Sequence, residues 1–231
     1  MTASPTAQAY QAAYWNETGG RAWVELQGLM DGLNKSVEDA VVEAAFPGAG
    51  KAVVDIGCGA GATTLAMARR LGAGGEALGV DVSQPLLELA RGRAEREGLA
   101  KARFALGDAQ TLDIGEGRFD AAMSRYGVMF FSDFDAAFAN IRRSVKAGGK
   151  MAFACWRRPA DNPLAAVPTP AAAHLLPPLP KPDPSAPGRF AFADPARVRG
   201  ILERSGWSDI AVDPLDAPTP ISLEDLTTLS L

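Results

Sequence analysis

Hydrophobic residues in the first part of the chain recur with a helical period. Between Trp23 and Val41 they are spaced three or four positions apart, which places them on one face of an amphipathic helix. One or two helices are therefore expected here, ending near Pro47 and Gly48. We interpret residues 1–47 as an N-terminal helical cap.

From residue 52 to residue 156, short apolar runs alternate with segments of helical periodicity. The runs are bounded by glycine or aspartate, which is typical of buried strands. Ser83 and Asp133 are expected to be N-caps of two of the helices, and Gly148-Gly149 to end the last one. The predicted strands are residues 52–56, 77–81, 103–106, 119–123 and 150–156.

Strands separated by helices of 10–15 residues need crossover connections, so their neighbours in the sheet run parallel. Helices then cover both faces of the sheet. The pattern predicts an α/β protein with a doubly wound, mostly parallel sheet, whose core is residues 48–156.

The composition changes after Trp156, because ten prolines occur between residues 159 and 187. Proline removes a backbone N–H and restricts the residue before it, so little regular structure is expected beyond a short helix at 171–176. A loop of this length within a compact domain is often functional. We interpret residues 157–193 as a Pro-rich lid insertion.

The core is expected to resume at Asp194 and Pro195, an N-cap and first-turn pair. The helix that they begin should end at Gly206, and a sixth strand is expected near residues 209–213. Residues 194–231 would complete the single domain. A further helix begins at Ser222 with a capping-box-like pattern, so we expect a chain that is truncated at its C-terminus.

Composition and charge exclude several function classes. The 231 residues carry a net charge of −4, which gives no basic surface for nucleic acid. The two cysteines have no cysteine or histidine at ligand spacing, so neither a metal site nor a redox pair is expected. No signal peptide or apolar run of membrane-spanning length is present in the sequence, and a cytoplasmic location is expected. Oligomeric state is left open.

The candidate chemistry lies where strands end. Glycines 57, 59 and 61 separate the first strand from a helix, where backbone N–H groups can approach a polar or anionic ligand. Asp81 ends the second strand, 24 residues after Gly57, and an acid at this place accepts hydrogen bonds from ribose hydroxyls. Asp108 follows the third strand. A ligand that contains ribose is therefore expected at this edge of the sheet.

Five stretches in order resemble class I S-adenosylmethionine-dependent methyltransferases, and within them the small-molecule group of ubiquinone and menaquinone biosynthesis. The stretches are residues 53–61 (VVDIGCGAG), 79–83 (GVDVS), 107–109 (GDA), 119–124 (FDAAMS) and 145–150 (VKAGGK). The resemblance implies a Rossmann-like methyltransferase fold, S-adenosyl-L-methionine as cofactor and methyl transfer to a small-molecule acceptor by in-line displacement. The family's seventh strand has no counterpart in the sequence.

The resemblance also implies roles for single residues. The glycine loop would lie against the methionine and ribose of the donor, Asp55 near its ammonium end, Asp81 at both ribose hydroxyls and Asp108 at the adenine amino group. Asp120 is expected to orient its strand. The implied cofactor-binding residues are Tyr14, Trp15, Asp55, Gly57, Cys58, Gly59, Gly61, Asp81, Val82, Asp108, Ala109 and Ser124.

No single catalytic residue is identified, because an activated methyl donor needs mainly alignment and exclusion of water. Candidates are Arg125, Tyr126 and His174, the last as a general base. Two alternatives stay open. The sequence from Gly57 to Ala62 also satisfies the GxGxxA pattern of NAD(P)-dependent oxidoreductases. A non-catalytic protein that binds S-adenosylmethionine for regulation would carry the same residues.

Overall fold

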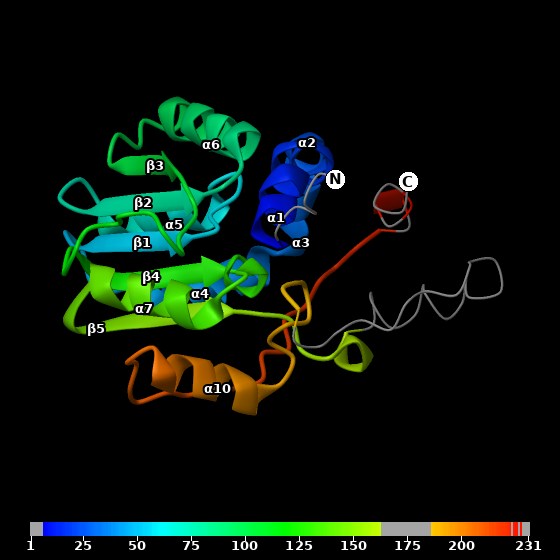
Figure 1. The fold of residues 1–231 in the computed structure, drawn as a ribbon. Helices are drawn as coiled ribbons and strands as arrows, with labels where there is room; N and C mark the ends of the chain where they lie inside the picture. Colours follow the sequence, from blue (N-terminus) through cyan, green and yellow to red (C-terminus); the bar gives the residue numbers. More distant parts are fainter. Residues whose placement is uncertain (1–6, 163–185, 223, 226, 228–231) are drawn as a thin grey trace, which may run out of the picture.

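The computed structural model describes residues 7–162, 186–222, 224, 225 and 227. Its centre is a five-stranded sheet in the order β3-β2-β1-β4-β5, and every neighbouring pair is parallel. The carboxyl ends of the strands therefore lie at one edge (Figure 1). The strands are β1 (Ala52–Ile56), β2 (Glu76–Asp81), β3 (Ala102–Leu106), β4 (Phe119–Arg125) and β5 (Val145–Ala154). The predicted doubly wound α/β fold is confirmed.

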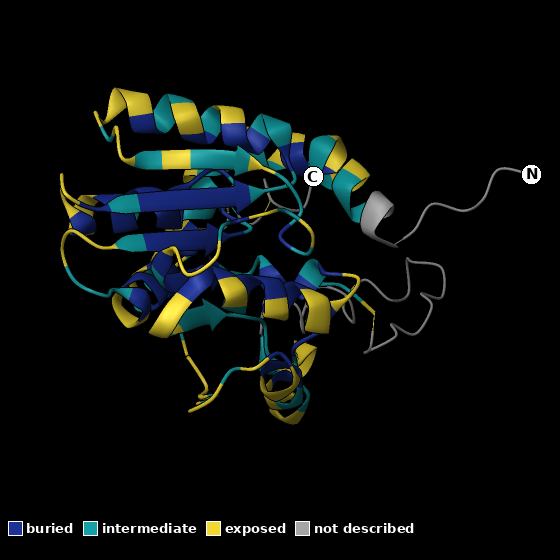
Figure 2. Ribbon diagram, turned by 60° about the vertical axis from the view of Figure 1, so that its left-hand side comes forward, coloured by how far each residue is buried: buried dark blue, intermediate teal, exposed yellow. Residues whose placement is uncertain are grey.

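Two hydrophobic clusters join the helices to the two faces of the sheet. On one face, α4 (Lys35–Ala45) packs on β4 and β5, α5 (Ala62–Leu71) packs on β1 and β2, and α6 (Gln84–Arg96) packs on β2 and β3. On the other face, α7 (Phe134–Ser144) lies against the sheet and α10 (Pro195–Arg204) packs beside it. Figure 2 shows the buried residues concentrated in the central strands and on the sheet-facing sides of the helices.

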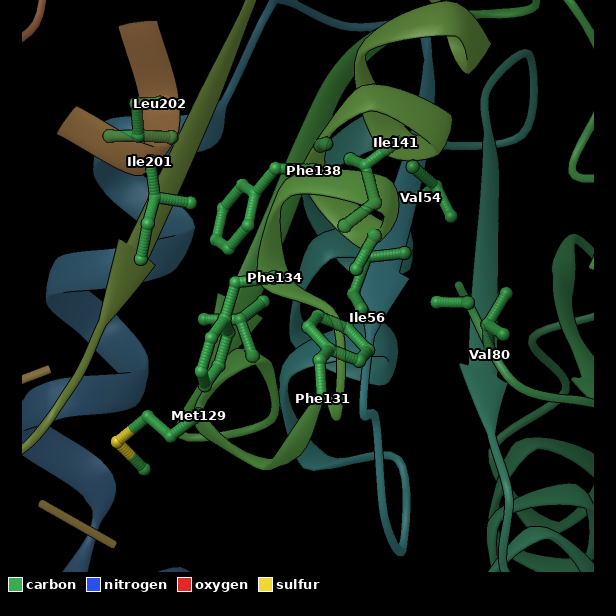
Figure 3. Packing of buried hydrophobic residues seen from close by; sticks show 14 of the residues in the cluster. Val54, Ile56, Val80, Met129, Phe131, Phe134, Phe138, Ile141, Ile201 and Leu202 are labelled. Carbon is green, nitrogen blue, oxygen red and sulfur yellow. The ribbon is translucent and has the colours of Figure 1, made fainter. Parts of the chain in front are cut away.

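The cluster around α7 shows how the helical period produces this packing. Phe138 and Ile141 are fully buried on that helix. Figure 3 shows the ring of Phe138 turned toward Ile201 of α10, while Ile141 points toward Val54 of β1. The second layer of helices is thus attached to the sheet through α7.

The N-terminal region forms more helices than expected. In place of one or two helices before residue 47, α1 (Ala7–Asn16), α2 (Thr18–Glu25) and α3 (Gln27–Leu33) precede α4. The chain turns at Leu26 and again at Asn34, and the glycines at 28 and 32 lower the helix propensity on this segment. Figure 1 shows α1 to α3 beside the carboxyl ends of the strands.

Two boundary predictions near the end of the sheet were wrong. Helix α7 ends at Ser144, not at Gly148, and β5 begins at Val145. Gly148 adopts a φ of +74° inside a register shift between β4 and β5, so it permits an irregularity in the strand. Residues 209–213 form no strand. Asp209 has a φ of +53°, and Pro214 follows without an N–H to donate to a ladder.

The predicted caps were largely confirmed. Asp133 accepts a hydrogen bond from the Ala136 N–H, and Asp194 accepts one from the Ala196 N–H. Ser83 occupies its predicted N-cap position without capping the helix, because its hydroxyl donates to the carbonyl of Trp15 instead. The helix predicted at 171–176 lies outside the described residues. Among the helices that are described, none is long and apolar enough to cross a membrane.

Candidate functional site

A cavity of about 460 Å³ lies at the carboxyl edge of the sheet. Residues at the strand ends line one side of it, which we call the floor, and residues of α1 to α3 line the other side, which we call the roof. Figure 1 shows these three helices beside the strand ends. Ligands bind at this edge in open α/β sheets. Predicted residues that line the cavity are Tyr14, Trp15, Gly57, Cys58, Gly59, Asp81, Val82, Asp108, Ala109, Arg125 and Tyr126.

The three glycines of the loop after β1 do different things. Gly59 has a φ of +53°, and a Cβ atom placed on it would meet no atom within 4 Å. Gly57 lies against the backbone of Gly127, with 2.5 Å between a Cβ placed on Gly57 and the Gly127 Cα. Gly61 starts α5, where a Cβ would collide with Ala90 and Phe104. Gly61 therefore serves packing, and the space beside Gly59 is open to a ligand.

Asp81 fixes this loop to the end of β2. Its Oδ2 accepts a hydrogen bond of 2.7 Å from the Gly59 N–H, and its Oδ1 accepts one of 2.9 Å from the Ser83 N–H. Each carboxylate oxygen keeps a further lone pair, because an ionised carboxylate offers about four acceptor sites. Burial raises the pKa of Asp81, while the backbone donors at Gly59 and Ser83 oppose that shift.

Asp55 lies beneath the loop and does not line the cavity. Its Oδ2 accepts hydrogen bonds of 2.6 Å from both Thr63 and Thr64, and its Oδ1 is buried without a partner among the described residues. Burial raises its pKa to about 6, against the effect of the two threonine hydroxyls and of Arg125. Asp55 therefore binds the first turn of α5 from below the loop, and its Oδ1 is left as an unused acceptor.

Asp108 is positioned by its neighbour Gln110. The backbone N–H of Gln110 donates to Asp108 Oδ1 at 2.9 Å, and its side-chain amide donates to Oδ2 at 2.8 Å. The amide oxygen of Gln110 accepts from the N–H of Asp133, at the start of α7. Gln110 therefore holds both carboxylate oxygens of Asp108, the acid that follows β3.

The segment after β4 contributes the opposite end of the cavity. Ser124 is fully buried, and its hydroxyl donates to the Ile56 carbonyl and accepts from the Gly127 N–H, so it does not line the cavity. Arg125 lies 3.7 Å from Glu38 Oε2, and both side chains are buried. Tyr126 has a φ of +65°, rare for a tyrosine, and its ring stacks on Trp156. Burial raises the pKa of Tyr126, which disfavours its use as a base.

The roof is tied to the floor by polar contacts that the sequence did not reveal. Asn16 donates to the Val82 carbonyl at 2.8 Å and accepts from the Gln84 N–H at 3.0 Å. Arg93 donates to the Ala60 carbonyl at 2.7 Å and lies 2.6 Å from Asp31 of α3. Helices α1 and α3 are thus held on the glycine loop and on the end of β2.

The remaining candidates lie elsewhere. His174 lies outside the described residues. Asp120 is at the opposite edge of the sheet, where it accepts from the Ala52 N–H and pairs with Lys146, so it orients the strands as expected. Among the described residues, no group of three potential metal ligands occurs. Lining residues missed from the sequence include Asp31, Gly127, Trp156 and Arg189.

Comparison with known proteins identifies the domain. Residues 53–149 match the model of a family described as a methyltransferase domain. An aklanonic acid methyltransferase of Streptomyces is 34% identical over 113 residues, which are 49% of this chain and 51% of the relative. A demethylmenaquinone methyltransferase of Thermus thermophilus is 34% identical over 110 residues, 48% of this chain and 49% of the relative. The chain spans about half the length of these curated relatives.

A solved structure supports the same fold. A SAM-dependent methyltransferase from Aquifex aeolicus superposes with a TM-score of 0.59, at 16% identity, over 79% of this chain and 87% of its own. Fold, strand-end acids and family match agree. Residues 53–149 therefore match the methyltransferase domain family, and the chain around them has the Rossmann-like fold of the Aquifex aeolicus structure.

Proposed function

We propose that the chain binds S-adenosylmethionine in the cavity and transfers its methyl group to a small-molecule acceptor. The observation that carries this proposal is the hydrogen bond from the Gly59 N–H to the Asp81 carboxylate. It holds the glycine loop, which leaves open space beside Gly59, next to a carboxylate with unused lone pairs. Such a pair suits a ligand with a ribose diol next to a charged chain.

The residues present fit this donor. A side chain on Gly59 would fill the space that its backbone leaves open. Asp81 would accept from the ribose hydroxyls, and Asp108, already oriented by Gln110, would accept from the adenine amino group. Asp31 lines the cavity, unlike Asp55, and one of its carboxylate oxygens has no described partner, so Asp31 is better placed to receive the ammonium group.

When bound, S-adenosylmethionine supplies a methyl group already activated on a sulfonium. Transfer to the acceptor would be an in-line displacement, with the thioether of S-adenosylhomocysteine as the leaving group. The chain's contribution is to align the acceptor and to exclude water. Seven aromatic side chains line the cavity and support this role: Tyr14, Trp15, Trp23, Tyr126, Phe130, Phe131 and Trp156.

The acceptor is proposed to be a small molecule, in agreement with the names of the two relatives above. In this proposal residues 1–47 cap the donor, 48–156 bind it and 194–231 complete the domain. Most of the lid expected at 157–193 lies outside the described residues. A cytoplasmic location stays a prediction from the sequence. An NAD(P)-dependent oxidoreductase is less favoured, because the family match is to methyltransferases. A non-catalytic protein that binds S-adenosylmethionine would not release S-adenosylhomocysteine with any acceptor, so a turnover assay distinguishes it from an enzyme.

Thermal unfolding with S-adenosylmethionine, S-adenosylhomocysteine or NAD tests the donor site. At about 100 times the dissociation constant, binding adds roughly 2.7 kcal/mol, which corresponds to a rise in Tm of about 5–11 °C. We expect this rise with the first two ligands and not with NAD. Asp81→Asn should abolish it, because an amide places a donor against a backbone N–H, whereas Asp113→Asn, at an exposed turn, should not.

Turnover is tested separately with a panel of phenols, quinols, amines and carboxylates, read as S-adenosylhomocysteine released. Release with any of them supports an enzyme. Tight donor binding without release across the panel supports the regulatory alternative. A rise in Tm with NAD alone contradicts the proposal.

A further inference from the structure

The five charged residues that line the cavity among those described are Asp31, Asp81, Asp108, Arg125 and Arg189. Four of them already have polar partners. Asp31 pairs with Arg93. Arg125 forms an ion pair of 3.7 Å with Glu38, although its Nη1 makes no hydrogen bond among the described residues. Asp81 and Asp108 accept hydrogen bonds from neighbouring N–H groups. Arg189 is the exception, and it lies far from the family-matched residues in sequence.

Arg189 contacts aromatic rings in place of a carboxylate. Its guanidinium carbon lies 4.1 Å from the centre of the Trp156 ring and 5.6 Å from that of Phe190. No carboxylate partner for it occurs in the described part of the chain. The residue as a whole is exposed at the rim of the cavity, yet partial burial of its charged group lowers the pKa of Arg189. The guanidinium is thus held in place with its N–H donors available.

The Trp156 ring that Arg189 contacts is itself stacked on a second ring. Tyr126 stacks on Trp156 with 4.8 Å between ring centres and an interplanar angle of 16°. Arg189, Trp156 and Tyr126 therefore form a stacked group at the ends of β4 and β5, which we call the Arg189 stack. Three strand spacings, each about 4.8 Å, separate the end of β5 from the end of β2, where Asp81 lies.

The two ends of the cavity consequently differ in charge. Carboxylates lie at the ends of β2 and β3, and the cation without a carboxylate partner lies near the end of β5. A guanidinium fork binds a carboxylate through two parallel hydrogen bonds, and its planar face stacks on rings. Aromatic walls favour a planar, apolar ligand body.

We propose that the methyl acceptor is an aromatic carboxylic acid, whose carboxylate pairs with Arg189 while its ring lies among the aromatic side chains of the cavity. The inference rests on the proposed function, because it assigns the donor to the Asp81 end and the acceptor to the Arg189 stack. It makes Arg189 a residue that determines acceptor specificity.

Matched acids and amides provide the test. Binding of 3,4-dihydroxybenzoate and 3-hydroxy-2-naphthoate to the full chain is measured by calorimetry against the corresponding amides, with saturating S-adenosylhomocysteine. The acids should bind at least about tenfold more tightly than the amides, since a charge-assisted pair is lost in the amide. Arg189→Met should reduce the preference to less than about twofold, and Arg189→Lys should retain part of it.

Arg157→Met is the matched control. Arg157 follows Trp156 directly, but it pairs with Asp216 at 3.0 Å, so its removal should leave the acid preference unchanged. Equal binding of acids and amides to the wild-type chain would overturn the inference. So would a tenfold weaker binding of S-adenosylhomocysteine by Arg189→Met, because Arg189 would then hold the carboxylate of the donor.

The same comparison without S-adenosylhomocysteine separates the two proposals. If S-adenosylhomocysteine does not bind, the proposed function fails, and the preference for acids is still measured on the free chain. If S-adenosylhomocysteine binds and no acid is preferred, only the assignment of the acceptor fails.

Discussion

Gly57 and Gly127 meet backbone to backbone beneath the cavity. A Cβ atom on Gly127 would lie 2.4 Å from the carbonyl oxygen of Ile56 and 2.7 Å from the Cα of Gly57. Gly127 has an ordinary φ of −80°, so any cost of a side chain there is steric and not conformational. The approach joins the loop after β1 to the segment after β4.

Gly127→Ala should therefore destabilise the fold by about 1–3 kcal/mol, the usual cost of overpacking. Urea denaturation measures this change. Gly28→Ala in α3 is the control, because no atom lies within 4 Å of its added Cβ. There the higher helix propensity of alanine should stabilise by up to about 1 kcal/mol. Equal midpoints for Gly127→Ala and wild type would show that the two loops can separate without cost.

Asn16 connects the roof to the donor end of the floor, so its loss should loosen α1. Asn16→Ala removes the hydrogen bonds to Val82 and Gln84, each expected to contribute about 1 kcal/mol. We expect faster hydrogen exchange in α1 and binding of S-adenosylhomocysteine weakened about tenfold. Gln84→Ala is the control, because the Gln84 side-chain amide donates to exposed Glu88 and its backbone N–H is retained. Unchanged exchange in Asn16→Ala would contradict this role.

The sequence predicted the donor end of the site better than the acceptor end. Asp81 and the glycine loop could be predicted because Asp81 ends β2 and the loop directly follows β1, and parallel strands bring their carboxyl ends together. Asp133 and Asp194 were predictable as caps because capping depends on residues within one helical turn.

The missed features depend on contacts between distant segments. Asn16, and not Ser83, accepts the hydrogen bond from the Gln84 N–H at the start of α6. Asn16 and Gln84 are 68 positions apart, so no local sequence pattern predicts this cap. Arg189 lies near the end of the Pro-rich insertion, where no periodicity predicts a neighbour, and it reaches the site because it stacks on Trp156. The sixth strand was wrong because alternating residues near Ile210 and Val212 pack on the core without forming a ladder.

Gln110 should act on the donor through Asp108. Gln110→Ala frees the Asp108 carboxylate from one of its two donors and from the start of α7. Wild type should bind S-adenosylhomocysteine about tenfold more tightly than S-inosylhomocysteine, which lacks the adenine amino group. In Gln110→Ala we expect this ratio to fall severalfold, measured by calorimetry. Gln27→Ala, on α3, should leave the ratio unchanged. A ratio near one in wild type would contradict the assignment of Asp108.

Asp55 should make stability depend on pH, because it titrates differently in the folded and unfolded chain. Burial raises its pKa from 3.8 to about 6, so the folded state holds the proton more tightly. The resulting stabilisation is fully present below pH 3.8 and is lost as the pH rises through 6. At 1.36 kcal/mol per unit, the loss between these limits is about 3 kcal/mol.

Asp55→Asn cannot titrate and should escape this loss. Its amide oxygen can still accept from Thr63 and Thr64, and its amide nitrogen replaces the oxygen that has no described partner. Relative to wild type, the variant should therefore gain up to about 3 kcal/mol between pH 4 and pH 7, measured by urea denaturation at both values. Asp113→Asn, at an exposed position, should show no such change. A constant difference between Asp55→Asn and wild type would mean that Asp55 is ionised throughout this range, with Arg125 offsetting its burial.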